Sequence, residues 1–340
     1  MIKLIPNEFK GIYNEIEFVN NITKDSFSLL SLDNSFCIFQ SMNNILYLIY
    51  SKINCSIISL NLIENKKINE IKNAHEENIT NFRHYLDINN KRDLILSISS
   101  LNNNIKIWNI NNYECLINIQ NINNNGILKS AYFLCDNNLI YIITSNNNSN
   151  YFSSEGIKVF DLNGKLKKEI KDSNDNIDFI DIYYDYNLLK IYIISGNNGN
   201  IKAYNYNENK IFMQYKDYKD YFDHSSIVMI NKEIIKIIES SGNGYIRIWN
   251  FYSGELLKKI KVGNSYLYSI CLLNNDNILV SCRDKKIKLI DIKNGLIKNE
   301  IININQEIIT LKKLYDIHYI NYIISQGKYD DQIKLWKIKY

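Results

Sequence analysis

Residues 105–110 read Ile105-Lys106-Ile107-Trp108-Asn109-Ile110, and this six-residue pattern decides the fold. Apolar and polar side chains alternate through its first half, which is the period-two signature of a β-strand. The pattern of apolar, polar, apolar, aromatic or apolar, Asn or Asp, and apolar residues returns along the whole chain, with a degenerate first copy and with Lys at the fifth position of the last one. The seven copies span residues 57–62, 105–110, 157–162, 201–206, 246–251, 287–292 and 333–338.

The spacing of these copies defines a repeat. Their fourth positions lie 41 to 52 residues apart, with a mean of 46. A short apolar run and a polar turn precede each copy, as in 93–104, and a turn and another strand-like stretch follow it, as in 253–260. Four short strands at this period predict the blades of a β-propeller. We expect one all-β domain over residues 1–340, with repeats at approximately 33–72, 73–120, 121–171, 172–216, 217–261, 262–302 and 303–340.

The two ends of the chain are expected to share one blade. The last repeat stops a few residues after Trp336, so it lacks a fourth strand, whereas residues 1–32 exceed what the first repeat needs. Either Gly11–Phe18 or Phe27–Leu32 can supply the missing strand. A propeller closed in this way has no unpaired inner edges and holds both chain ends in place.

At these residues the chain resembles the WD40-repeat family, and the resemblance extends over essentially the whole chain. Four pairs hold the place of the family's Trp-Asp pair, and two pairs hold the place of the Gly-His pair that opens a repeat. The Trp-Asp positions are Trp108-Asn109, Phe160-Asp161, Trp249-Asn250 and Ile290-Asp291, and the Gly-His positions are Ala74-His75 and Asp223-His224. The resemblance implies a seven-bladed WD40-type propeller with four-stranded antiparallel blades, closed by an N-terminal strand that joins the last blade.

The resemblance also implies a structural hydrogen-bond network inside a blade, which runs from the His through a Ser and a turn acid to the Trp. In the second blade the matching residues are His75, Ser100, Asn102 and Trp108, and in the fifth they are His224, Ser241, Asn243 and Trp249. Asn replaces the acid in both blades, so we expect a neutral and weaker network.

Composition and charge point to an ordinary globular chain of a reducing compartment. The net charge is +4, with 40 basic and 36 acidic residues scattered along 340 positions, and only one Pro and 12 Gly are present. The six cysteines form no C-x-x-C pair, and the four histidines have no metal-ligand spacing. No apolar run is long enough for a membrane span, and the first ten residues lack a signal-peptide core. We expect a cytoplasmic or nuclear protein.

Catalytic motifs are not found. The chain has no G-x-G-x-x-G, no G-x-x-x-x-G-K-[ST] and no G-x-S-x-G. Asn81-Phe82-Arg83-His84 lacks the second arginine of the phosphoinositide-binding loop of some propellers, and we expect it within a first strand. The Asp178 and Asp181 carboxyl groups are expected at strand edges or in loops, where solvated acids are not tuned for acid–base work. We therefore expect no catalytic residues, no metal ligands and no cofactor.

The remaining candidates are aromatic side chains in long loops at one end of the blades. Aromatic side chains beside mixed charge serve as anchors in protein interfaces. A plainer interpretation is that these rings fold back over their own blade. The candidate rim residues for binding partner proteins or peptides are Tyr151, Phe152, Tyr218, Tyr221, Phe222, Arg283 and Tyr329.

Three functions remain open from the sequence. The first is a non-catalytic scaffold that binds proteins or peptides through this rim. The second is an enzyme or small-ligand binder that uses the central channel, although the inner strands show no convergent acids, histidines or metal ligands. The third is binding to nucleic acid or an anionic membrane surface, which requires Lys to gather on one face. The scattered Lys residues favour the first, and we expect no nucleic-acid partner.

Overall fold

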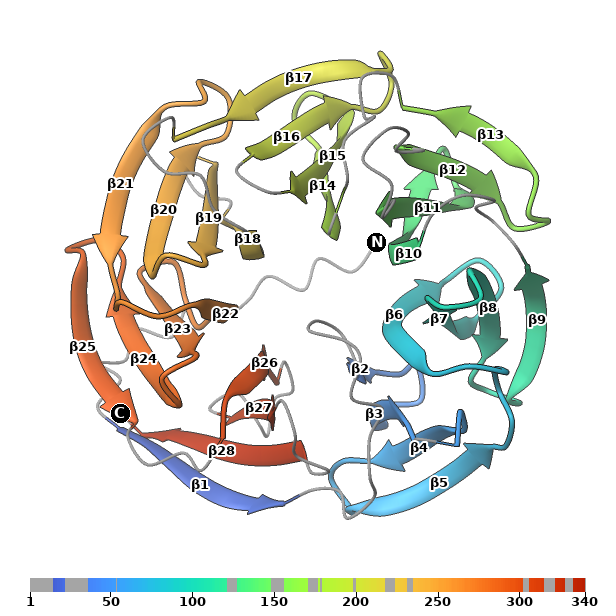
Figure 1. The fold of residues 1–340 in the computed structure, drawn as a ribbon. Helices are drawn as coiled ribbons and strands as arrows, with labels where there is room; N and C mark the ends of the chain where they lie inside the picture. The colour runs from blue at the N-terminus through green and yellow to red at the C-terminus, as the bar shows by residue number, and fades with distance from the viewer. Residues whose placement is uncertain are drawn as a thin grey trace. The chain divides into compact units, whose positions relative to one another are not determined.

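The computed structural model describes residues 15–21, 36–52, 54–120, 127–147, 156–170, 177, 179–197, 200–217, 224–230, 235–301, 306–314, 322–327 and 333–339. Its 28 described strands form seven four-stranded sheets, drawn in Figure 1, and no helix occurs in these residues. The prediction of an all-β, seven-bladed propeller fold with four-stranded antiparallel blades is confirmed. That residues 1–340 fold as one domain stays a prediction.

Each sheet is a simple meander of strands that are consecutive in the chain, except the last. Sheets 1 to 4 consist of β2 (Phe36–Gln40), β3 (Leu46–Ser51), β4 (Ile57–Asn61) and β5 (Lys66–Ile71); β6 (Ile79–Asp87), β7 (Arg92–Ser99), β8 (Asn104–Asn109) and β9 (Glu114–Ile119); β10 (Ile127–Asp136), β11 (Leu139–Asn147), β12 (Ile157–Asp161) and β13 (Leu166–Glu169); and β14 (Phe179–Asp185), β15 (Lys190–Asn197), β16 (Asn200–Asn205) and β17 (Lys210–Tyr215). Sheets 5 to 7 consist of β18 (His224–Ile230), β19 (Lys236–Ser241), β20 (Tyr245–Asn250) and β21 (Leu256–Lys261); β22 (Leu267–Leu272), β23 (Asn277–Cys282), β24 (Lys286–Asp291) and β25 (Leu296–Ile301); and β26 (Ile308–Lys313), β27 (Tyr322–Gly327), β28 (Ile333–Lys339) and β1 (Glu15–Asn21).

Sheet 7 joins strands from the two ends of the sequence. β1 runs antiparallel to β28, with Phe18 opposite Trp336 and Glu15 opposite Lys339, and the two strands lie side by side in Figure 1. β1 overlaps the expected segment Gly11–Phe18, whereas the alternative Phe27–Leu32 lies outside the described residues.

The chain forms two compact units. Unit 1 consists of Met1–Thr23, Ser225–Ile248 and Leu257–Tyr340, and unit 2 consists of Lys24–His224 and Trp249–Leu256. Sheets 1 to 4 therefore belong to unit 2, and sheets 6 and 7 belong to unit 1.

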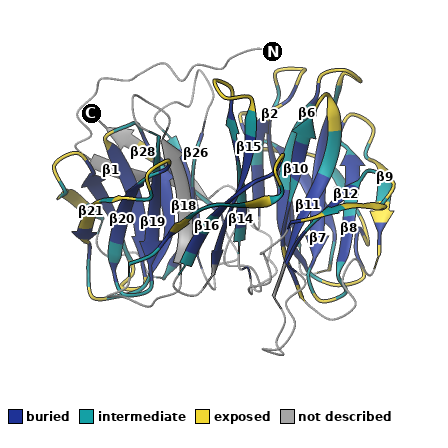
Figure 2. Cartoon of the chain, turned by 90° about the horizontal axis from the view of Figure 1, so that it is seen from above, coloured by how far each residue is buried: buried dark blue, intermediate teal, exposed yellow. Residues whose placement is uncertain are grey.

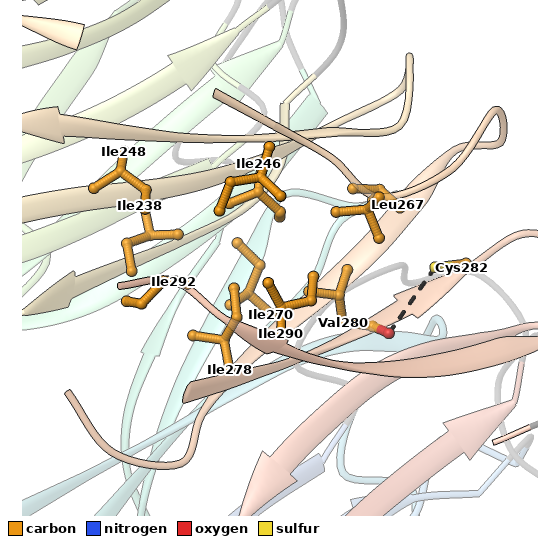
Figure 3. Close-up of a cluster of buried hydrophobic side chains, with 12 residues drawn as sticks. Ile238, Ile246, Ile248, Leu267, Ile270, Ile278, Val280, Cys282, Ile290 and Ile292 are labelled. Atoms are coloured by element: carbon orange, nitrogen blue, oxygen red, sulfur yellow. Dashed lines mark hydrogen bonds between the residues drawn. The ribbon is translucent and has the colours of Figure 1, made fainter. Parts of the chain in front are cut away.

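The core of each unit lies between neighbouring sheets and is built mainly from isoleucine. In unit 1, Ile238, Ile246 and Ile248 of sheet 5 face Ile270, Ile278 and Ile290 of sheet 6 (Figure 3). β-Branched side chains fit the pleated surface of a strand, which explains why so many isoleucines form strands here. Second strands such as β7 are buried on both faces, whereas outer strands such as β9 are mostly exposed or half-buried (Figure 2).

Asparagine makes many of the turns. A left-handed backbone is costly for most residues other than glycine, and asparagine tolerates it better than the rest. Its side chain also accepts bonds from nearby amides, as when Asn109 Oδ1 accepts the N–H of Asn111 at 3.0 Å. The asparagines with positive φ are Asn44, Asn65, Asn73, Asn103, Asn137, Asn138 and Asn209.

Candidate functional site

The candidate site is the end of the sheets that we call the rim, formed by the turns between second and third strands and by the connections from one sheet to the next. In a four-stranded meander these two kinds of segment lie at the same end, and the turns between first and second strands lie at the other. The expected binding residues belong to the rim, so its construction decides what it can do.

In sheet 2 a buried side-chain network supports the rim. Ser97 Oγ on β7 lies 2.7 Å from His75 Nε2 and accepts a hydrogen bond of 2.8 Å from Trp108 Nε1 on β8. Lys106 Nζ donates to the carbonyl oxygen of Ala74 at 2.7 Å, which fixes the connection between β5 and β6. Burial is the main cause that lowers the pKa of His75 to about 3, and the charge of Lys106 adds to it. His75 is therefore neutral at physiological pH, and its role is structural.

The hydroxyl of this network is that of Ser97, and the prediction of Ser100 was wrong. Ser97 lies within β7, opposite Lys106, on the face of the sheet that carries Trp108. Ser100 lies beyond the end of β7, and its Oγ is 2.6 Å from Thr80 Oγ1. Among the residues that the structure describes, the buried Oδ1 atom of Asn102 has no hydrogen-bond partner.

Sheet 7 contains the same serine–tryptophan hydrogen bond as sheet 2, whereas the described residues of sheet 5 do not form it. Trp336 Nε1 donates to Ser325 Oγ at 2.7 Å, and Ser325 lies opposite Lys334 just as Ser97 lies opposite Lys106. In sheet 5 the expected residues Ser241 and Asn243 bond to each other at 2.5 Å, but Trp249 Nε1 has no hydrogen-bond partner among the described residues. The side chain of His224 lies outside the described residues, so its expected role is a prediction.

Sheet 5 instead contains a buried ion pair. Arg247 Nη1 lies 3.2 Å from Glu239 Oε1, and the two side chains are only 2% and 1% exposed. Such a pair compensates two charges that are costly to bury alone. No sequence signal beyond the strand pattern pointed to it, because an Arg and a Glu eight residues apart are common on any chain.

Backbone hydrogen bonds tie the rim segments together. Ala74 N donates to Cys55 O at 3.0 Å, Arg283 N to Tyr266 O at 2.8 Å, and Val262 N to Gly244 O at 2.9 Å. Each bond joins a turn between second and third strands to a connection between sheets. The described part of the rim is therefore a set of fixed turns rather than of free loops.

Of the seven predicted rim residues, the structure describes one. Arg283 is exposed in the turn between β23 and β24, within unit 1. The other six, Tyr151, Phe152, Tyr218, Tyr221, Phe222 and Tyr329, lie outside the described residues. Their joint use as a binding surface stays a prediction.

The inner strands of unit 2 carry a polar cluster that the sequence did not reveal. Arg83 on β6 places its guanidinium carbon 4.0 Å from the ring centre of Tyr132 on β10, and it donates to the Tyr132 hydroxyl and to Phe82 O. Burial raises the pKa of the Asp181 carboxyl on β14, and the charge of Arg83 partly opposes this rise. Arg83 does lie in a first strand, as predicted, but its contact with the next sheet could not be read from the spacing of residues.

His84, on β6 of sheet 2, also has a structural role. His84 Nε2 lies 2.8 Å from Asp93 Oδ1, and its ring stacks on Phe39 with the centres 3.8 Å apart. Burial lowers the pKa of His84 although Asp93 favours the charged form. Asp93 Oδ2 also accepts the N–H of Met42 at 3.1 Å, so this pair joins sheets 1 and 2.

The structure offers no metal centre and no membrane-spanning helix among the residues it describes. No group of three or more His, Cys, Asp or Glu side chains there is arranged to hold a metal ion. Within the same ranges, no helix has the length and hydropathy needed to cross a bilayer.

Comparison with known proteins agrees with the repeat architecture. The family model described as "WD domain, G-beta repeat" matches residues 254–291, which run from the end of sheet 5 through β24 and include the Ile290-Asp291 pair. No curated protein matches the chain. The family match over one repeat and the seven four-stranded sheets together confirm the resemblance to the WD40-repeat family, whose propellers typically serve as protein-interaction scaffolds.

Proposed function

We propose that this chain is a non-catalytic scaffold that binds partner proteins or peptides at its rim. The observation that carries the proposal is the set of backbone bonds that join rim turns to sheet connections, at Ala74, Val262 and Arg283. Segments fixed in this way present side chains with little loss of conformational freedom on binding, which favours affinity. The WD40 match adds a family whose typical role is the same.

The side chains that we assign to partner contact are the seven rim residues named above. Tyr and Phe would supply buried anchors, and Arg283 would supply a polar contact at the border. In this assignment the partner binds with little change in the backbone of the sheets, since these are tied by their cores.

The described ionisable groups support a binding role rather than catalysis. His75 is held neutral by burial, and His84 is occupied by Asp93 and Phe39. Several surface lysines pair with acids, as Lys190 and Lys210 do with Glu208, so the described surface carries mixed charge. A polyanion such as nucleic acid needs a basic face, and mixed charge suits a protein partner better.

The test is a proximity-labelling comparison of the wild type with a variant in which Tyr151, Phe152, Tyr221 and Phe222 are changed to Ala. We expect the rim variant to lose specific partners while its melting temperature stays within a few degrees of the wild type. A matched control changes the exposed Leu296 and Ile297, on the outer strand β25, to Asn. An unchanged partner set for a stable rim variant would refute the proposal.

A small-ligand function at the inner strands is the second candidate, and the cluster of Arg83, Tyr132 and Asp181 is the observation that favours it. An arginine, a phenol and a carboxyl group on three successive first strands can contact a ligand that carries both charges. A panel of amino acids and small carboxylates, tested by thermal shift on wild type and Arg83→Met, separates this role from a purely structural one. A ligand that raises the melting temperature of the wild type but not that of Arg83→Met would support the small-ligand function.

A further inference from the structure

Five of the 12 glycines in the chain directly follow an asparagine, a pair that is prone to spontaneous deamidation. Glycine has no side chain, so its amide nitrogen can approach the side-chain carbonyl carbon of the preceding asparagine. The structure describes three of these pairs, Asn163-Gly164, Asn243-Gly244 and Asn294-Gly295, and the other two lie outside the described residues. Each of the three lies in a turn between two strands, so the groups around the asparagine decide which pair reacts.

The reaction takes place within the chain and consumes only water. The glycine nitrogen loses its proton to solvent and attacks Cγ of the asparagine, which forms an N–Cγ bond and places negative charge on Oδ1. The bond from Cγ to Nδ2 then breaks, and the side-chain nitrogen takes up a proton and leaves as ammonia. Water opens the resulting five-membered ring at either carbonyl and gives aspartate or isoaspartate. A hydrogen-bond donor on the peptide oxygen makes the glycine N–H more acidic, and a donor on Oδ1 stabilises the charge of the attack, so both speed the reaction.

Asn243 has a donor at both places. Ser241 Oγ donates to Asn243 Oδ1 at 2.5 Å, and the same hydroxyl lies farther, 3.0 Å, from Tyr245 O. Lys261 Nζ donates to Asn243 O at 3.0 Å, and this oxygen belongs to the peptide group of the attacking Gly244 nitrogen. A cationic donor there stabilises the deprotonated amide. Both donors are held in place, because Ser241 is fully buried at the end of β19 and Lys261 Nζ lies 4.2 Å from the ring centre of Tyr245.

The other two pairs lack a donor on the asparagine Oδ1 among the residues that the structure describes. Asn294 Nδ2 donates to Asp291 Oδ2 at 2.9 Å, so a carboxylate lies beside this amide and opposes negative charge on it. Asn163 bonds to Asp161 Oδ1 through its backbone N–H, at 2.9 Å. The glycine N–H donates to a backbone carbonyl in all three turns, at 2.8 to 3.1 Å, so that bond does not distinguish them.

We propose that Asn243 is a site of spontaneous deamidation, promoted by Ser241 and Lys261. The aspartate product fits the turn, because its carboxylate still accepts the bond from Ser241 and lies near the charge of Lys261. The reaction adds one negative charge to a rim turn with time and is irreversible once ammonia has left. This inference does not rest on the proposed function, since the chemistry is the same whether or not the rim binds a partner.

The isoaspartate product does not fit the turn. It adds one methylene group to the backbone beside Gly244, where a Cβ atom would already lie 2.1 Å from Gly263 O. The turn must then move away from the connection between β21 and β22, and the 2.9 Å bond from Val262 N to Gly244 O is lost. Chains that carry isoaspartate therefore have an altered rim.

The test is peptide mapping by mass spectrometry of the full chain after incubation for increasing times at mildly alkaline pH. We expect Asn243 to deamidate at least about tenfold faster than Asn163 and Asn294, since one well-placed donor to a developing oxyanion is worth at least this factor. The two slower sites are internal controls in the same molecules. Reaction of Asn243 no faster than either of them would overturn the proposal.

Variants at the two donors test the mechanism. Lys261→Met and Ser241→Ala should each slow the reaction of Asn243 about tenfold, whereas Ser241→Thr keeps the hydroxyl and should keep the rate. Lys258→Met is the matched control, because this lysine lies on the same strand, donates to Lys293 O and should not affect Asn243. Lys261 is exposed, so its variant decides the question even if Ser241→Ala does not fold. An unchanged rate in Lys261→Met would refute the role of the donors.

The products give a second measurement. The isoaspartate form, separated from the aged protein by ion exchange, should melt at a lower temperature than the variant Asn243→Asp, which represents the aspartate product. Equal melting temperatures would show that the turn accommodates the longer backbone, and the predicted change of the rim would be wrong.

Discussion

The hydroxyl of Ser97 joins two buried groups, the imidazole of His75 and the indole N–H of Trp108. A buried polar atom that loses its partner carries the full cost of its removal from water, whereas the bond itself contributes less. The stability of sheet 2 therefore depends on this one oxygen more than on most others.

Replacing Ser97 by Ala should lower the free energy of unfolding by about 2–4 kcal/mol, because Trp108 Nε1 and His75 Nε2 lose their partner together. Urea denaturation of the purified chain measures this. The matched control, Ser100→Ala, should cost less than about 1 kcal/mol, since it removes only the contact with Thr80. Equal losses in the two variants would contradict the network described here.

The position of Trp108 in a third strand and the burial of His75 could be predicted from the repeat pattern. The serine could not, because Ser97 and Ser100 both lie near the end of the second strand in the sequence. Only the pairing of Ser97 with Lys106 shows which hydroxyl shares a face with Trp108. The contact of Arg83 with Tyr132 was missed for a related reason, since it crosses from one sheet to the next.

The buried His75 makes stability depend on pH. Its pKa is about 3 in the folded chain against an ordinary value of 6.5, so the unfolded chain binds more protons between these values. The contribution of His75 is fully present above pH 6.5, and the free energy of unfolding falls by up to about 1.4 kcal/mol per pH unit as the pH drops toward 3.

His75→Gln should remove this dependence. Denaturation midpoints measured from pH 7 to pH 4 should fall less steeply for the variant than for the wild type, while the carboxylates contribute equally to both. Parallel pH profiles would show that His75 is accessible to protons in the folded chain.

At the scale of turns and strands, the shortage of glycine and proline indicates that other residues make most of the turns. Asparagine takes over many of these turns, as the positive φ angles of Asn44, Asn103 and Asn209 show. The sequence shows where turns lie, but side-chain exposure requires the structure.

Gly244 occupies a turn where no other residue fits. Its φ is 79°, and a Cβ atom there would lie 2.1 Å from the carbonyl oxygen of Gly263. In the same close contact of the two segments, Val262 N donates to Gly244 O at 2.9 Å. This turn therefore depends on glycine for both its conformation and its close contact.

Gly244→Ala should lower the free energy of unfolding by about 2 kcal/mol or more, from backbone strain and from the displaced connection. Gly263→Ala is the matched control, because its nearest neighbour would be Lys288 Nζ at 3.5 Å, and the change should be close to neutral. Thermal denaturation of both variants tests this, and similar melting temperatures would contradict it.

At the scale of the whole molecule, sheet 7 depends on both ends of the chain. The sequence predicted that an N-terminal segment supplies a strand and left two candidates open. β1, which pairs with β28, overlaps the first of them, Gly11–Phe18, and closure of the ring by this segment stays a prediction. The choice could not be made from the sequence, because each candidate carries several apolar residues and can form an outer strand.

Deleting residues 1–32 should lower the melting temperature by more than about 10 °C, because the loss of β1 leaves the edge of β28 unpaired. Calorimetry of the truncated chain measures this. Deletion of residues 1–14 keeps β1 and is the matched control, with no change expected. An unaltered transition after the longer deletion would show that β1 adds nothing to stability.

The pairing of β1 with β28 has a consequence for synthesis on the ribosome. β1 is translated more than 300 residues before its partner strand. Throughout elongation it has no hydrogen-bond partner in sheet 7, while sheets 1 to 6 can form in order behind it. The last sheet can only assemble after β28 has emerged, so a nascent chain that stalls early exposes a strand able to pair with foreign edges.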